Sequence, residues 1–163
     1  MTLKPTRLLN VFLFITSLTL ALPFATADKG NSAASKKSET IKITLLGTDQ
    51  MQFDKKELKV SKGSTIELTL RHSGKLPVNV MGHNFVLLKP GVDIAKFAMA
   101  AMQAKDTGYV LPKQAKDVIA KTGLVGGGAS TTITFKAPSP GTYDYICTFP
   151  GHYAMMKGKL VVE

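Results

Sequence analysis

Cysteine and histidine are scarce in this sequence, which contains one cysteine and three histidines in 163 residues. A single cysteine excludes an internal disulfide framework. The thiol of Cys147 is therefore either a spare buried group or a functional one. An exposed free thiol would be a liability in an oxidising compartment, so the choice depends on the residues around it.

The N-terminal region has the features of a secretory signal peptide. Lys4 and Arg7 precede an apolar run over residues 8–22, and a small-x-small motif ending at Ala27 follows it. This pattern predicts a signal peptide over residues 1–27, cleavage after Ala27 and export to the periplasm. The run is shorter than the ~18 apolar residues of a membrane-spanning helix, so we expect no stable membrane insertion. No cysteine stands just after the cleavage site, which excludes a lipoprotein anchor.

The rest of the chain divides into a polar segment and one domain. Residues 28–39 contain no large apolar residue and predict a flexible tether. Residues 40–163 have the balance of a single globular domain. Cleavage removes Lys4 and Arg7, which lowers the formal net charge of +10 by two. The remaining positive charge favours acidic partners, but the lysines are scattered and form no basic helix, which argues against nucleic acid as a partner.

Short apolar segments with period-two alternation predict an all-β fold. The predicted strands cover residues 40–45, 57–60, 65–72, 80–88, 118–124, 131–136, 142–147 and 157–162. One stretch, 93–105, has helical spacing instead, and its apolar positions are expected to pack on the core. These positions are Ile94, Phe97, Ala98, Ala101 and Met102. The glycine run 126–128 predicts a hairpin turn. Together these elements predict a Greek-key β-sandwich with one inserted helix.

The segment from Cys147 to Met156 places a thiol, an imidazole and a thioether within ten residues. Cys147 ends a predicted strand, and a Pro-Gly turn before His152 bends the chain so that the three side chains can converge. The spacing from His152 favours Met156 over Met155 as the third donor. Thiolate, imidazole and thioether are the donors that redox-active copper selects.

A second histidine would complete the His₂Cys set with a weak axial methionine that is typical of electron-transfer copper sites. His83, at a distant point in the sequence, can supply it, and the site would then join two separate segments. His72 has no candidate ligand beside it and is expected to be a hydrogen-bonded core histidine. We therefore predict one copper ion that cycles between Cu(II) and Cu(I) in a rigid loop.

Four other functions use some of the same residues. A Cys-His nucleophile pair would need a group that orients His152 and a helix start that activates Cys147, and the loop provides neither. Zinc prefers more thiolates and no thioether. A copper enzyme would need further histidines for a second metal, and His72 alone cannot supply them. Copper storage or delivery remains an alternative, although a rigid buried site argues against it. We therefore expect an electron carrier and not an enzyme.

Four motifs, in order along the chain, resemble the azurins and their auracyanin relatives in the cupredoxin family of type 1 blue copper proteins. They are DQMQF at 49–53, LPVNVMGHN at 76–84, CTFPGH at 147–152 and MKG at 156–158. The resemblance covers nearly all of residues 40–163. It implies a monomeric carrier that exchanges electrons with redox proteins such as c-type cytochromes or a terminal reductase or oxidase.

The resemblance also implies roles for individual residues. The implied copper ligands are His83, Cys147 and His152 in the equatorial plane, Met156 in the axial position and, weakly, the carbonyl of Gly82. Backbone N–H groups of Asn84 and Phe149 would donate hydrogen bonds to the Cys147 sulfur and tune the reduction potential of the copper ion. An apolar patch around the edge of His152 would pass the electron to the partner. The residues that match this patch are Met51, Leu76, Val80, Met81, Phe149, Pro150, Ala154 and Met155.

The sequence departs from the azurin pattern at three places. Ile41 and Ser64 stand where azurins carry a disulfide at the opposite end of the sandwich, which resembles the auracyanins more closely. Phe85 stands where many azurins have tryptophan after the first ligand. The tether at 28–39 is longer than a minimal azurin would have.

Overall fold

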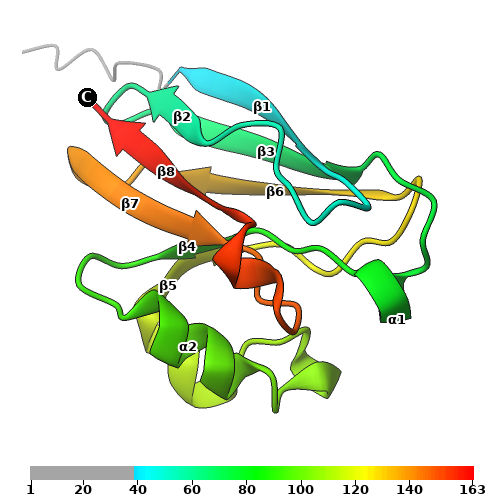
Figure 1. The fold of residues 1–163 in the computed structure, drawn as a ribbon. Coiled ribbons are helices and arrows are strands. Elements are labelled where there is room, and N and C mark those ends of the chain that lie inside the picture. Colours follow the sequence, from blue (N-terminus) through cyan, green and yellow to red (C-terminus); the bar gives the residue numbers. More distant parts are fainter. Residues whose placement is uncertain (1–38) are drawn as a thin grey trace, which may run out of the picture. The chain divides into compact units, whose positions relative to one another are not determined.

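The computed structural model describes residues 39–163, so the predicted signal peptide, and the predicted tether except for Glu39, lie outside the described residues. Two sheets face each other in Figure 1. The three-stranded sheet has the order β1 (Thr40–Gly47), β3 (Thr65–His72) and β6 (Ser130–Lys136). The five-stranded sheet has the order β2 (Glu57–Val60), β8 (Lys157–Val162), β7 (Gly141–Ile146), β4 (Val86–Leu88) and β5 (Val118–Lys121). The predicted all-β Greek-key sandwich is confirmed.

Alternating side chains explain why these segments form half-buried strands. In β3, Ile66, Leu68 and Leu70 are completely buried, and the residues between them are partly exposed. Parallel pairing with β1 sets Leu45 beside Leu70, and this pair faces the second sheet. Burial of a side chain of this size contributes roughly 1.5–3 kcal/mol to folding. The core between the sheets therefore holds the two layers together.

The inserted helix α2 (Ile94–Ala101) lies between β4 and β5 in the chain and packs beside the segment that follows β7. The Asp93 carboxylate caps it by accepting a hydrogen bond from the Lys96 N–H at 3.0 Å. Phe97, Ala98 and Ala101 are buried in a second, smaller core. The predicted core position of Met102 is wrong, because the helix ends at Ala101 and the Met102 side chain is 40% exposed. The chain continues through the 3₁₀ turns η1 (Lys105–Thr107) and η2 (Pro112–Asp117).

The predicted strand over 80–88 is wrong in its first half. Residues Val78–Met81 form a short helix, α1, whose N–H groups at Val80 and Met81 donate to the Pro77 carbonyl. The chain then extends, and β4 begins only at Val86. Pro77 is the N-cap residue, with an extended backbone (ψ 159°), and its carbonyl accepts both of these bonds, so the turn forms locally despite the alternating apolar pattern of this stretch.

The glycine run 126–128 does not form the predicted hairpin. It joins β5, which ends at Lys121, to β6, which begins at Ser130, and these two strands belong to different sheets. A Cβ atom at Gly126 or Gly127 would lie within 2.6 Å of backbone atoms of Val78 or Lys75. The run is therefore rich in glycine because the chain passes close to the loop before α1 while it crosses between the sheets.

Candidate metal centre

Three of the predicted ligands meet at one end of the sandwich. One ligand atom each from His83, Cys147 and His152 lies within 4.8 Å of the others, and all three residues are buried. His83 follows α1 and pairs with Val125 in an isolated bridge, while Cys147 comes directly after β7. His152 begins the 3₁₀ turn η3 (His152–Ala154). We call residues 147–156 the ligand loop.

Backbone hydrogen bonds close the ligand loop on itself. The Cys147 N–H donates to the Met156 carbonyl at 2.9 Å, and the Met156 N–H donates to the His152 carbonyl at 2.8 Å. The His152 N–H donates to the Phe149 carbonyl at 3.0 Å. Gly151 has φ 82°, a left-handed conformation that favours glycine. The turn residues thus bring the side chains at both ends of the loop to the same point.

The two methionines at the end of the ligand loop differ in how deeply they are buried. Met156 is completely buried and belongs to the same core cluster as Cys147, whereas Met155 is 49% exposed. Only the Met156 thioether is therefore buried in the interior. This agrees with the choice that the spacing favoured, and its role as axial ligand stays a prediction.

The His83 ring is oriented for binding by its second nitrogen. Its Nε2 lies 2.9 Å from the Thr48 carbonyl oxygen and donates to it, so the lone pair of the neutral ring is on Nδ1. Nδ1 is the one buried side-chain nitrogen or oxygen without a hydrogen-bond partner among the residues that the structure describes. A buried polar atom left in this state costs about 1–3 kcal/mol. A metal ion bound at Nδ1 would account for it.

The protonation states of the other two groups also suit a cation. Burial, reinforced by the charges of His83 and His72, lowers the pKa of His152 to about 4, so its ring is neutral at pH 7. Burial raises the pKa of Cys147 to about 12, although the N–H groups of Asn84 and Phe149 act in the opposite direction. The Cys147 sulfur lies 3.7 Å from His152 Nδ1. Two neutral imidazoles and a thiol that ionises only with a cation beside it fit a soft metal ion.

Gly82 brings a backbone oxygen to the same place. Its carbonyl oxygen lies 3.9 Å from the Cys147 sulfur. A Cβ atom at Gly82 would lie 2.5 Å from the Val78 carbonyl oxygen and 2.9 Å from the Phe149 ring. Only glycine therefore allows the end of α1, the ligand loop and His83 to pack this closely.

The side chain of Asn84 ties the two ligand segments together, which the sequence analysis missed. Its Oδ1 accepts from the Thr148 N–H at 2.8 Å, and its Nδ2 donates to the Thr148 hydroxyl at 2.8 Å. The same Nδ2 also donates to the Gly108 carbonyl at 3.0 Å. The only sign of this role in the sequence is that Asn84 is a polar residue next to His83. Its partners, Gly108 and Thr148, are distant in sequence.

His72 has a larger part in the site than the sequence indicated. Its Nδ1 accepts from the Gly74 N–H, and its Nε2 lies 3.0 Å from the Met81 carbonyl oxygen, as expected for a hydrogen-bonded core histidine. The ring also stacks on His83, with centroids 4.3 Å apart and an angle of 8°. His72 thus packs against the ring of the predicted ligand His83 and is not itself a predicted ligand.

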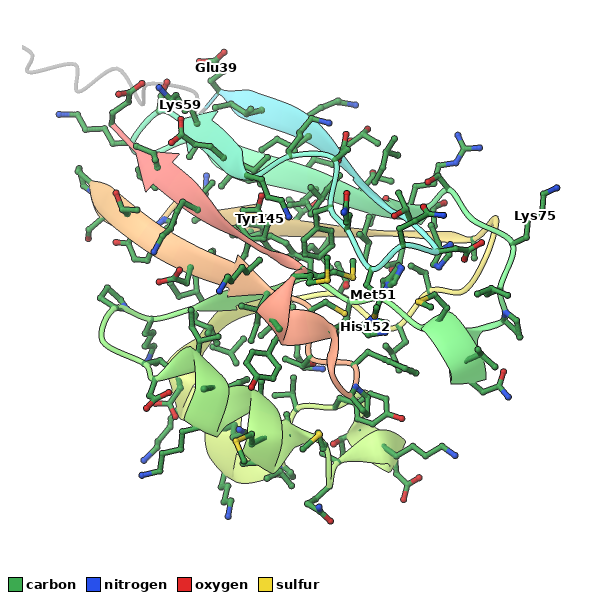
Figure 2. All side chains as sticks on the ribbon, in the orientation of Figure 1. Glu39, Met51, Lys59, Lys75, Tyr145 and His152 are labelled. Atoms are coloured by element: carbon green, nitrogen blue, oxygen red, sulfur yellow. The ribbon has the colours of Figure 1, made fainter. Side chains whose placement is uncertain are left out.

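Apolar side chains are exposed on the ligand loop and on and just before α1. Leu76, Val80 and Met155 of the predicted patch are 38%, 53% and 49% exposed, while Phe149 is buried. Val78, which the sequence analysis did not include, is 44% exposed beside them. Figure 2 shows His152 and Met51 at this end of the sandwich.

Comparisons with known proteins agree with this geometry. Residues 39–163 match the family of "Copper binding proteins, plastocyanin/azurin family". The chain is 42% identical over 127 residues to azurin from Pseudomonas chlororaphis, a match that covers 75% of the chain and 98% of the azurin. It is 40% identical over 125 residues to auracyanin-A from Chloroflexus aurantiacus, with 76% and 74% covered.

A solved structure of auracyanin A from Chloroflexus aurantiacus, described as a "blue" copper protein, superposes with a TM-score of 0.70 at 35% identity. This match covers 76% of the chain and 99% of the auracyanin. None of the helices within residues 39–163 is long and apolar enough to cross a membrane.

Proposed function

The chain belongs to the plastocyanin/azurin family of copper-binding proteins, and from this we propose that it carries single electrons at one type 1 copper centre. The proposed ligands are His83 Nδ1, the Cys147 thiolate, His152 Nδ1, the Met156 thioether and, weakly, the Gly82 carbonyl. The observation that carries the proposal is the buried His83 Nδ1, which lacks a hydrogen bond and lies with the other two donors within 4.8 Å.

Copper bound here would accept and release one electron, and the protein's own groups would keep the geometry constant. The Thr48 carbonyl fixes the His83 ring, and Asn84 joins the segment of His83 to that of Cys147. The buried sulfur is shielded from water, and the closed ligand loop resists a change in shape. Little rearrangement is then needed when the charge of the centre changes.

Addition of Cu(II) to the metal-free protein is expected to give an intense blue colour from the thiolate, and Cys147→Ser is expected to abolish it. Met156→Leu is expected to shift the absorption and the reduction potential, because it replaces the buried thioether. Met155→Leu is the matched control and is expected to leave both unchanged, because Met155 is exposed. A wild-type protein that stays colourless would contradict the proposal.

We place the protein in the periplasm because its N-terminal sequence has the pattern of a signal peptide. We expect a monomer that docks with redox proteins such as c-type cytochromes, or a terminal reductase or oxidase, through the apolar patch near His152. No substrate chemistry is proposed, because both ring nitrogens of His72 have hydrogen-bond partners and no further histidine remains for a second metal.

Copper storage or delivery is distinguished from electron transfer by two measurements on the loaded protein. A storage protein would lose copper rapidly to a chelator and would not exchange electrons with a cytochrome. A carrier is expected to keep its copper in the presence of the chelator. It is also expected to be reduced rapidly when it is mixed with a reduced cytochrome in a stopped-flow experiment.

A further inference from the structure

Lys55 and Lys56, which precede β2, accept hydrogen bonds from the residues that flank the ligand loop in sequence. The Tyr145 hydroxyl, two residues before Cys147, donates to the Lys55 carbonyl at 2.6 Å. The Lys159 N–H, three residues after the loop, donates to the Lys56 carbonyl at 2.8 Å. Tyr145 is completely buried, and Figure 2 shows it between the two sheets. We call residues 55–56 the strap.

The strap also reaches the loop itself. The Lys56 ammonium donates to the Met155 carbonyl at 2.9 Å, across 99 residues of sequence. The fit leaves no space at Gly158, where a Cβ atom would lie 2.2 Å from the Tyr145 hydroxyl oxygen and 2.7 Å from the Lys56 carbonyl oxygen. The strap is therefore positioned by buried groups and not only by an exposed side chain.

Lys56 differs from the neighbouring lysines because its ammonium group has no ion-pair partner among residues 39–163. The Lys55 ammonium pairs with the Asp54 carboxylate, and the Lys59 ammonium lies 3.4 Å from a Glu57 carboxylate oxygen. Lys56 has no carboxylate within 4.0 Å among residues 39–163. Its positive charge beside the ligand loop is therefore not neutralised by an ion pair.

We propose that Lys56 is a positioning residue of the metal centre, which fixes the Met155 carbonyl and favours the reduced state through its charge. The inference rests on the proposed function. The reduced centre carries one positive charge fewer than the oxidised centre, so a nearby cation stabilises it by comparison and raises the reduction potential. Because the ammonium is solvent-exposed, dissolved salt screens this effect.

Hydrogen exchange in the metal-free protein tests the positioning role without copper. Lys56→Met keeps most of the side-chain length but cannot donate to Met155. We expect the N–H groups of Met155 and Met156 to exchange about fivefold faster, the factor that corresponds to one ordinary hydrogen bond. Lys59→Met, at a lysine that does not contact the loop, is expected to leave these rates unchanged.

Potential measurements on the copper-loaded protein test the role of the charge. At an ionic strength of about 0.01 M, where the screening length is ~30 Å, Lys56→Met is expected to have a lower potential than wild type. At about 1 M, where it is ~3 Å, the difference is expected to shrink. Lys56→Arg keeps the charge and a donor and is expected to restore the wild-type value. Lys59→Met removes a charge that is paired with Glu57 and is expected to lower the potential less than Lys56→Met does.

Wild-type exchange rates in Lys56→Met would overturn the positioning role. An unchanged potential at low salt, an equal fall in Lys59→Met or a fall that salt does not reduce would overturn the role of the charge. A wild-type protein that gives neither blue colour nor a reversible couple would instead overturn the proposed function. The exchange measurement would still decide whether Lys56 holds the loop.

Discussion

The His152 ring is buried and neutral, and its protonation couples the stability of the metal-free protein to pH. Burial lowers the pKa of His152 to about 4 from its ordinary value of 6.5. Between these values the unfolded chain binds the proton and the folded protein does not. Burial also lowers the pKa of His83, which adds an effect of the same sign.

The metal-free protein is therefore expected to lose stability as the pH falls from about 6.5 towards about 4, and to reach a plateau above this window that extends to about pH 9, where the raised pKa of Cys147 begins to lower stability again. The contribution of His152 is on the order of 3 kcal/mol, because one pKa unit corresponds to about 1.4 kcal/mol. Urea denaturation of the metal-free protein at a series of pH values measures it. His152→Gln, which cannot be protonated, is expected to flatten the profile, and an equally steep profile in this variant would contradict the assignment.

At the scale of the elements, Asn84 links the segment that carries His83 to the ligand loop. Asn84→Ala removes three hydrogen bonds and leaves the buried Thr148 N–H without a partner. We expect the free energy of unfolding to fall by about 2–4 kcal/mol, measured by urea denaturation without copper. Asn79→Ala, in the exposed helix α1, is the control and is expected to change it by less than about 0.5 kcal/mol.

The close packing of α1 on the ligand loop gives a second prediction at this scale. Gly82→Ala would place a methyl group against the Val78 carbonyl and the Phe149 ring. We expect a loss of about 1–3 kcal/mol in stability and a broadened blue absorption in the loaded protein, because the two segments must separate. Gly123→Ala is the matched control, since nothing lies within 4 Å of its Cβ position. Equal effects of the two changes would refute the packing argument.

For the whole molecule, local patterns predicted most of the strands and the convergence of three donors on one end. The bounds of β2, β3 and β8 agree with the sequence because their alternation is regular and turn residues flank them. Alternation gave a wrong result for 80–88, where Pro77 starts α1, and it could not show that β5 and β6 lie in different sheets. The stacking of His72 on His83, and the strap at 55–56, depend on contacts between residues that no local pattern connects.

Copper binding should stabilise the whole fold, because the proposed ligands come from segments that only the folded chain brings together. A ligand that binds only the folded state at a concentration 1,000 times its dissociation constant adds about 4 kcal/mol to the free energy of unfolding. We therefore expect scanning calorimetry to show a higher melting temperature with copper than without it. In Cys147→Ser, which lacks the thiolate, copper is expected to raise the melting temperature much less. The same increase in both proteins would mean that copper stabilises the chain from a site elsewhere.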